Sequence, residues 1–164
     1  MDLRSRIARQ HVLHLRRTSV PGFTLVETAV VVLLIGILVA IAMPYYGDWR
    51  NRVNTLEATN EIAGNQAVVE TYRVMNGRLP DSWADMPFAR KIDPWGRPYV
   101  YYNIEANGKG HARKDHALNP LNTDYDMYSV GPDGVTKAQI TQKDSVDDVI
   151  RASNGGYVGI ASGF

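Results

Sequence analysis

Residues 21–47 read PGFTLVETAVVVLLIGILVAIAMPYYG, and this stretch decides the fold. The twenty residues from Thr28 to Gly47 contain no charged side chain. As a helix, twenty residues extend about 30 Å, which matches the hydrocarbon thickness of a bilayer. Glu27 is the exception, since it puts a carboxylate at the start of this apolar segment. The stretch predicts a membrane-spanning helix with an acidic group near one end.

The charge distribution predicts the orientation of that helix. Residues 1–22 carry a net charge of +4, and the rest of the 164-residue chain carries −3. Because basic flanks stay in the cytoplasm, we expect a cytoplasmic N-terminus, with everything after Gly47 on the opposite side of the membrane. The chain has no cysteine, which excludes disulfides, thiol catalysis and cysteine-based zinc sites. The length indicates one modest domain, and the balanced charge argues neither for nor against nucleic acid. We expect no nucleic-acid partner, because the tyrosines are expected to pack the sheet and the sequence has no phosphate-cradling glycine loop.

Three interpretations of the apolar segment are open: a plain anchor, a signal peptide cut at Ala40-Ile-Ala42, or a leader removed just before the segment. Glu27 favours the third. A carboxylate at bilayer depth costs about 2–3 kcal/mol and therefore needs a partner. Cleavage after Gly22 would create an α-amine on Phe23, four residues from Glu27. This pair could form within one helix or between neighbouring subunits, where it would fix their axial register.

The helical pattern continues past Gly47 as far as Asn76, where Gly77 supplies a C-cap and Pro80 prevents continuation. A helix over residues 23–76 would have 54 residues and extend about 80 Å. Its first half is too long to be covered by the small domain and must contact lipid or other copies. We expect the second half to turn an apolar stripe toward that domain. The stripe comprises Trp49, Val53, Leu56, Ala63, Ala67 and Val74.

Three later segments have strand character: residues 97–104, 125–130 and 156–160. Gly131-Pro-Asp-Gly is a turn signal after the second of them. Two or three antiparallel strands would cover the apolar stripe of the helix. The predicted fold class is therefore α+β, with a long N-terminal helix on a small antiparallel sheet and a C-terminal loop region.

The motif G-F-T-L-V-E at residues 22–27 resembles the N-terminal signal of type IV pilins and pseudopilins. The resemblance implies that a prepilin peptidase cleaves after Gly22 and methylates Phe23, and that Glu27 acts in assembly. Pro44, twenty-second from the cut, matches the helix proline of the family. Three further motifs are similar to those of the major pseudopilin of type II secretion. They are N-G-R-L-P at 76–80, D-P-W-G-R-P-Y at 93–99 and D-M-Y-S-V-G-P-D-G at 126–134.

The resemblance implies four parts: a removed leader (1–22), a transmembrane assembly helix (23–47), its amphipathic continuation (48–77) and a β-rich periplasmic domain (78–164). It implies a structural subunit of a type II secretion pseudopilus, anchored in the inner membrane and polymerised through its helix. Its expected partners are further copies, the peptidase, minor pseudopilins and the inner-membrane assembly platform. The alternatives are a type IV pilin of a surface filament and a membrane-anchored periplasmic binding or enzyme domain.

The acidic C-terminal loop has two interpretations. From the residues alone it is a solvated loop, whereas the resemblance implies a calcium site. The expected ligands are the side chains of Asp133, Asp147 and Asp148 and the carbonyls of Val130 and Ser145. Two features depart from the family: the segment from Asp133 to Asp147 is longer, and the usual I-G-N-W is replaced by V-I-R-A-S-N. The histidines at 111 and 116 lie in a polar loop, and no catalytic constellation is apparent, so we expect a protein that is not an enzyme.

Overall fold

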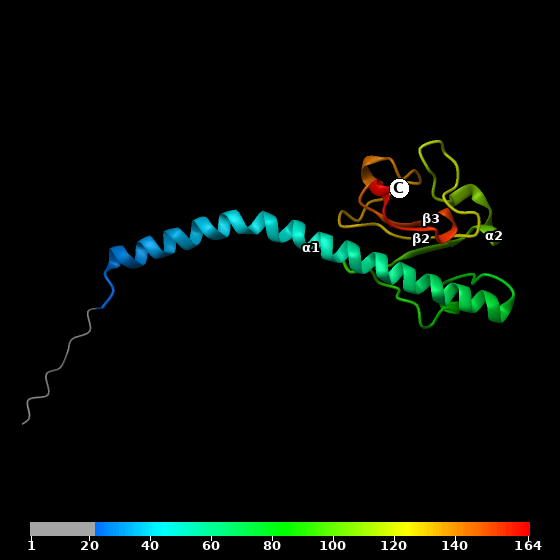
Figure 1. Ribbon diagram of the computed structural model, residues 1–164, viewed down its shortest axis with the longest axis horizontal. Helices are drawn as coiled ribbons and strands as arrows, with labels where there is room; N and C mark the ends of the chain where they lie inside the picture. Colours follow the sequence, from blue (N-terminus) through cyan, green and yellow to red (C-terminus); the bar gives the residue numbers. More distant parts are fainter. Residues whose placement is uncertain (1–21) are drawn as a thin grey trace, which may run out of the picture. The chain divides into compact units, whose positions relative to one another are not determined.

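The computed structural model describes residues 22–164, so all but the last residue of the predicted leader lies outside the described residues. The chain divides between Ile41 and Ala42 into two units, which are considered separately. Helix α1 covers Leu25–Asn76 and continues through Pro44 (Figure 1). It ends as predicted, because Gly77 has a φ of 69° and its amide donates to the carbonyl of Arg73 at 2.8 Å.

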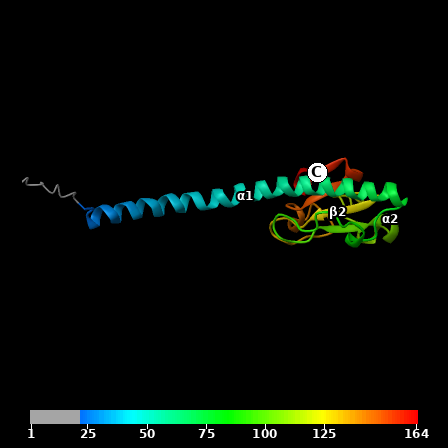
Figure 2. The same cartoon turned by 90° about the horizontal axis from the view of Figure 1, so that it is seen from below.

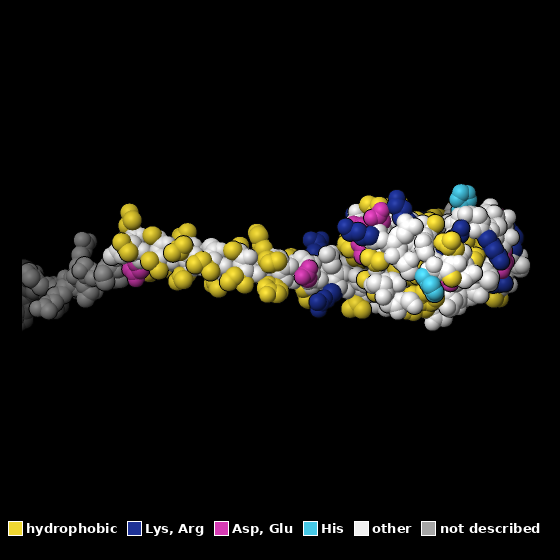
Figure 3. Space-filling view, turned by 90° about the horizontal axis from the view of Figure 1, so that it is seen from above, with side chains coloured by type: hydrophobic (Ala, Val, Ile, Leu, Met, Phe, Trp, Pro, Cys, Tyr) yellow, Lys and Arg dark blue, Asp and Glu magenta, His cyan; other side chains and the backbone are white. Residues whose placement is uncertain are grey.

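The part of α1 in the N-terminal unit buries none of its side chains. Phe23, Leu25 and Val26 are 70–83% exposed, and the valines, leucines and isoleucines that follow are about half exposed or more. Figure 3 shows hydrophobic side chains along this part of the helix. Among the described residues, α1 is the one helix long and apolar enough to cross a membrane. The predicted membrane-spanning segment is therefore a bare apolar helix.

Four short strands form the sheet of the C-terminal unit. They are β1 (Val100–Asn103), β2 (Tyr125–Ser129), β3 (Val149–Ala152) and β4 (Tyr157–Ile160). They pair in the order β1-β2-β3-β4, and every pair is antiparallel. A short helix α2 (Ile104–Asn107) follows β1. The expected strands at 97–104, 125–130 and 156–160 are confirmed at their cores, whereas β3 was not predicted.

One face of the sheet packs on the C-terminal half of α1 (Figure 2). The helix buries Ala58, Ile62, Asn65 and Val69 at spacings of four, three and four residues, so they form one stripe. Ala58, Ile62 and Val69 share a core with Tyr99, Tyr125, Met127 and Val149. The predicted stripe was wrong: Leu56 is 67% exposed and Val74 is 84% exposed. The helix thus has one buried apolar stripe and another that faces outward.

The opposite face of the sheet is covered by loops. Side chains alternate along β3, so Val149 joins the core under α1 while Ile150 points to the other side. Ile150 packs with Leu121, Ile140, Ala152 and Ala161 in a second cluster. Ile140 belongs to the long segment between Asp133 and Asp147, so that segment forms part of the fold.

Candidate functional site

The beginning of α1 is a capping box that involves Glu27. The Glu27 amide donates to Thr24 Oγ1 at 3.2 Å, and the Thr24 amide donates to Glu27 Oε2 at 3.4 Å. This reciprocal pair satisfies two amides that a helix N-terminus would otherwise leave without partners. The T-L-V-E spacing is the sequence signal for it, and our sequence analysis had missed it. Glu27 has a local role that does not depend on another subunit.

The geometry also places Glu27 close to the predicted new terminus. Phe23 directly precedes Thr24, whose amide already contacts the Glu27 carboxylate. Phe23 is 82% exposed, and Glu27 is exposed as well. An α-amine created on Phe23 would lie one residue from an amide that Glu27 accepts from. Cleavage, methylation and the assembly role of Pro44 remain predictions.

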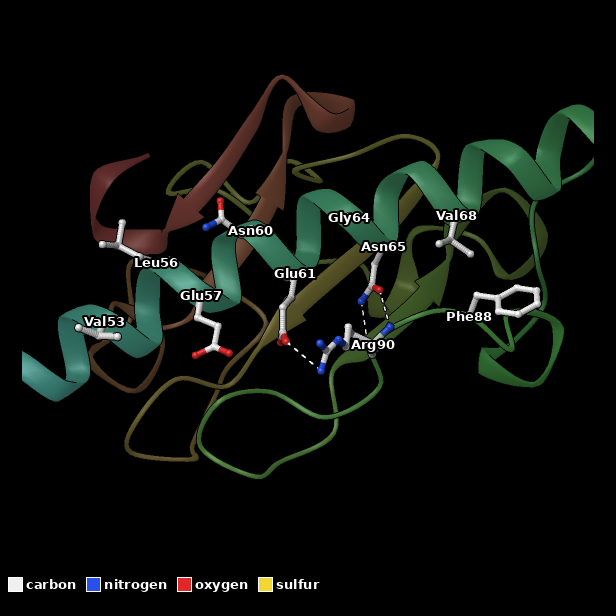
Figure 4. Close-up of a pocket in the computed structure, with 10 residues that line it drawn as sticks. All are labelled: Val53, Leu56, Glu57, Asn60, Glu61, Gly64, Asn65, Val68, Phe88 and Arg90. Atoms are coloured by element: carbon white, nitrogen blue, oxygen red, sulfur yellow. Dashed lines mark hydrogen bonds and ion pairs between the residues drawn. The ribbon is translucent and has the colours of Figure 1, made fainter.

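The outward face of α1 in the C-terminal unit borders a groove of about 660 Å³ (Figure 4). Its floor includes Val53 and Leu56 of the outward stripe, the partly buried Val68 and the polar side chains between them, and its far wall is Phe88 and Arg90. The side-chain amide of Asn65 fixes the position of Arg90. Its oxygen accepts from the Arg90 backbone N–H at 2.6 Å, and its nitrogen donates to the Arg90 carbonyl at 2.7 Å. The Phe88 side chain is 89% exposed. This apolar surface has no cover within residues 22–164.

Two of the signature motifs meet at one corner of the sheet. Asp93 Oδ1 accepts from the amides of Trp95 and Arg97 at 3.0 and 2.8 Å, which closes the D-P-W-G-R turn. Its other oxygen accepts from the Ser129 hydroxyl at the end of β2 at 2.5 Å. The Arg97 guanidinium then donates to the carbonyls of Gly131 and Pro132. The motifs at 93–99 and 126–134 therefore have a structural role, which is to join the turn before β1 to the turn after β2.

Glycine is required at both ends of the G-P-D-G turn. Gly131 and Gly134 have φ angles of 68° and 75°. A Cβ on Gly131 would lie 2.5 Å from the carbonyl oxygen of Asp147, and one on Gly134 would lie 2.7 Å from the Arg97 guanidinium. The turn therefore approaches the predicted calcium loop closely through its backbone.

The structure places the predicted calcium ligands in different environments. Asp148 and Ser145 are fully buried, Asp147 and Val130 are partly buried, and Asp133 is exposed. Asp133 Oδ1 accepts from the Val135 amide at 2.8 Å, and the Ser145 carbonyl accepts from the Asp148 amide at 3.3 Å. Several of the expected donor groups therefore already have protein partners.

A buried arginine that our sequence analysis had missed, Arg113, neutralises Asp148. Its Nη2 lies 2.6 Å from Asp148 Oδ2, and both side chains are nearly inaccessible to solvent. The guanidinium also covers the Tyr128 ring at 4.3 Å from the ring centre. Burial raises the pKa of Asp148 to about 6, and the hydrogen bond from Thr136 and the charge of Arg113 oppose this rise. Arg113 lies in the segment G-H-A-R-K-D-H, whose polar composition predicts a surface loop, and the burial of Arg113 corrects that prediction.

A second buried arginine stabilises the face of the sheet that packs on α1. Arg151 on β3 makes hydrogen bonds of 2.8 and 2.7 Å to the two carboxylate oxygens of Asp124 and stacks on the Tyr125 ring. Burial alone would raise the pKa of Asp124, but the hydrogen bonds from Arg151 and the Tyr125 amide lower it overall. The charged residue within V-I-R-A explains why β3 escaped prediction.

In this fold, the side chains of the expected donor set do not come together as a calcium site within the described residues. Calcium takes six to eight oxygen ligands at 2.3–2.6 Å. Within residues 22–164, no three His, Asp or Glu side chains come together in a group that could hold a metal ion. One oxygen each of Asp147 and Asp148 is buried without a hydrogen-bond partner, and these two are fewer than calcium needs. Calcium binding by this loop remains a prediction from the resemblance.

Comparisons with known proteins are consistent with this architecture. The chain is 26% identical over 141 residues to the type II secretion system core protein G of Pseudomonas aeruginosa, an alignment that covers 73% of this chain and 89% of that protein. It is 25% identical over 134 residues to the core protein G of Escherichia coli, covering 69% of this chain and 82% of that protein. A type IV major pilin protein of Neisseria gonorrhoeae is 36% identical over 61 residues, which is 37% of either chain.

No family model and no solved structure matches the chain. The relatives fall into two related groups, and both share segments with this sequence. Their similarity agrees with the G-F-T-L-V-E signal, the bare apolar helix and the antiparallel sheet. The chain is therefore similar to type II secretion pseudopilins over most of its length and to type IV pilins over a shorter part.

Proposed function

We propose that this protein is a structural subunit of a type II secretion pseudopilus. The observation that carries the proposal is the apolar part of α1, which has no buried residue in a single copy. Such a surface is stable only in lipid or against other helices of the same kind. A subunit that waits in the membrane and then polymerises uses both environments in turn.

The proposed route begins in the inner membrane, with the N-terminus in the cytoplasm and the sheet domain in the periplasm. A prepilin peptidase removes residues 1–22 and methylates Phe23. Glu27 then pairs with the new terminus of a neighbouring copy and sets the axial register. Minor pseudopilins and the inner-membrane assembly platform are the expected partners. No step requires catalysis by this chain, so we propose that it is not an enzyme.

The second candidate is a type IV pilin of a surface filament. The 36% identity to the gonococcal pilin favours it, but that similarity covers only 37% of the chain. The similarity to core protein G extends over about 70% of it and is matched by the motifs at 93–99 and 126–134. The coverage therefore favours the pseudopilus.

Two measurements test the proposal. Intact-mass spectrometry after co-expression with a prepilin peptidase should find a chain that begins with methylated Phe23, and cleavage after Ala42 would contradict the proposal. Deletion of the gene in its own bacterium should abolish export of folded proteins to the medium. Loss of surface filaments with unchanged export would favour the pilin.

A further inference from the structure

We propose that the Arg113 guanidinium takes the place of a divalent cation in the C-terminal loop, so that residues 130–148 fold without calcium. The proposal concerns the folding of this loop, and it is independent of whether the chain assembles into a pseudopilus. It begins from a buried carboxylate, Asp148, which is 0% exposed and needs a positive charge beside it.

The protein supplies that charge and the hydrogen bonds that go with it. Arg113 Nη2 donates to Asp148 Oδ2 at 2.6 Å, and the Thr136 hydroxyl donates to the same oxygen at 2.6 Å. Arg113 Nη1 donates to the Thr136 hydroxyl, so the three side chains close a small network. The Arg113 amide is fixed in turn by Asp126 Oδ2 at 2.6 Å. A paired and hydrogen-bonded ion is the form in which a charge is tolerated in the interior.

The lengthened loop provides part of this arrangement. Thr136 lies inside the segment from Asp133 to Asp147. The backbone of the same segment pairs with the strand-like residues after Arg113, because the Lys114 amide donates to the Ala138 carbonyl at 2.8 Å and the Ile140 amide donates to the Lys114 carbonyl at 3.0 Å. Ile140 is 4% exposed in the second core cluster. Hydrogen bonds and apolar packing thus hold the loop in place.

The charge arrangement argues against an additional cation at the same carboxylate. A divalent ion bound at Asp148 would lie beside the buried guanidinium of Arg113, and like charges repel strongly where solvent is excluded. Of the remaining expected ligands, Asp133 is exposed and accepts from the Val135 amide, whereas Asp147 Oδ1 and Asp148 Oδ1 are buried without hydrogen-bond partners and are the oxygens that a cation would have to use. Arg113 and a calcium ion are therefore alternatives at this position.

The test compares melting temperatures of the full chain in detergent, with EDTA, with 10 mM magnesium and with 10 mM calcium. A calcium site with a Kd of about 0.1 mM would raise the melting temperature by roughly 4 °C or more at that concentration. We expect the wild-type values to agree within about 1 °C in all three buffers. A rise of several degrees with calcium alone, abolished by Asp147→Asn, would overturn the proposal.

Arg113→Gln tests the arginine directly. Removal of one partner of a buried ion pair should lower the melting temperature by about 10 °C, and calcium should restore part of this loss because the carboxylates become available. Arg151→Gln is the matched control: it breaks the buried pair on the other face, and calcium should not restore it. A wild-type melting temperature for Arg113→Gln would refute the inference. If that variant does not fold, protease resistance of the wild-type loop in EDTA decides, since a calcium-dependent loop would be cut.

Discussion

Replacement of Glu27 separates its two roles, helix capping and charge pairing between subunits. Glu27→Gln keeps an oxygen that can accept from the Thr24 amide, now at 3.4 Å, but it removes the negative charge. Glu27→Ala removes both. Loss of a cap costs about 1 kcal/mol, whereas a charge left without its partner at bilayer depth costs about 3 kcal/mol. The charge is therefore the larger contribution.

These energies convert into assembly equilibria. About 3 kcal/mol per subunit contact corresponds to a change of roughly 150-fold, and about 1 kcal/mol to roughly fivefold. We expect Glu27→Gln to reach the membrane at wild-type levels but to form almost no filaments. Thr24→Val, which removes the Thr24 oxygen of the capping box and leaves the charge, should reduce filaments only a few-fold. It is the matched control for Glu27→Gln.

The assay is the ratio of sheared or cross-linked filaments to membrane-inserted subunit, measured by immunoblot in cells with a functional assembly platform. Normal filament yield from Glu27→Gln, together with a defect in Thr24→Val, would show that capping is the function of Glu27. The charge-pairing argument would then be refuted.

Three further outcomes are expected. Ile62→Ala should lower the free energy of unfolding of the sheet domain by about 3 kcal/mol in thermal unfolding, because it leaves a cavity in the buried stripe of α1. Leu56→Ala, on the outward stripe, should change this free energy by less than about 0.5 kcal/mol. Equal losses would contradict the packing. The hydrogen bonds from Arg151 lower the pKa of Asp124, so the stabilising contribution of the Asp124 carboxylate is complete above about pH 4 and is lost as the pH falls further. Asp124→Asn should flatten this part of the stability–pH curve. An unchanged curve would refute the assignment of this pH dependence to Asp124. Gly131→Ala should cost about 2 kcal/mol or more, measured by denaturant unfolding, through its left-handed φ and its close backbone neighbour; a neutral effect would contradict the turn geometry.

The sequence predicted the elements whose signals are local. The apolar run, the Gly77 stop and the turn at 131–134 each depend on neighbouring residues, and the structure confirms the helix end and the turn. The prediction of the buried stripe was wrong because Leu56 and Val74, which face outward, also recur at helical spacing. Hydrophobic periodicity shows that one face of a helix is apolar, but it does not show whether the residues that pack on this face belong to the same chain.

The missed features depend on contacts between distant segments. Arg113 and Asp148 are 35 residues apart, and Arg151 and Asp124 are 27 apart. An arginine in a polar or strand-like segment is normally assigned to the surface. Its burial becomes predictable only when the fold has brought an aspartate and an aromatic ring to the same place. Cleavage after Gly22, methylation of Phe23 and the assembly roles remain predictions, and the mass spectrometry and filament assays described above test them.

The capping box has a consequence for the lifetime of the uncut precursor. A carboxylate in an apolar helix ordinarily destabilises a chain that is inserted in a lipid bilayer. Here the Thr24 amide, just before the first residue of the helix, already donates to the Glu27 carboxylate, and the positive end of the helix dipole lies beside it. If the proposed cleavage after Gly22 takes place, an uncut precursor can wait in the membrane without a neighbour, and the new α-amine of Phe23 forms beside a carboxylate that is already held in position.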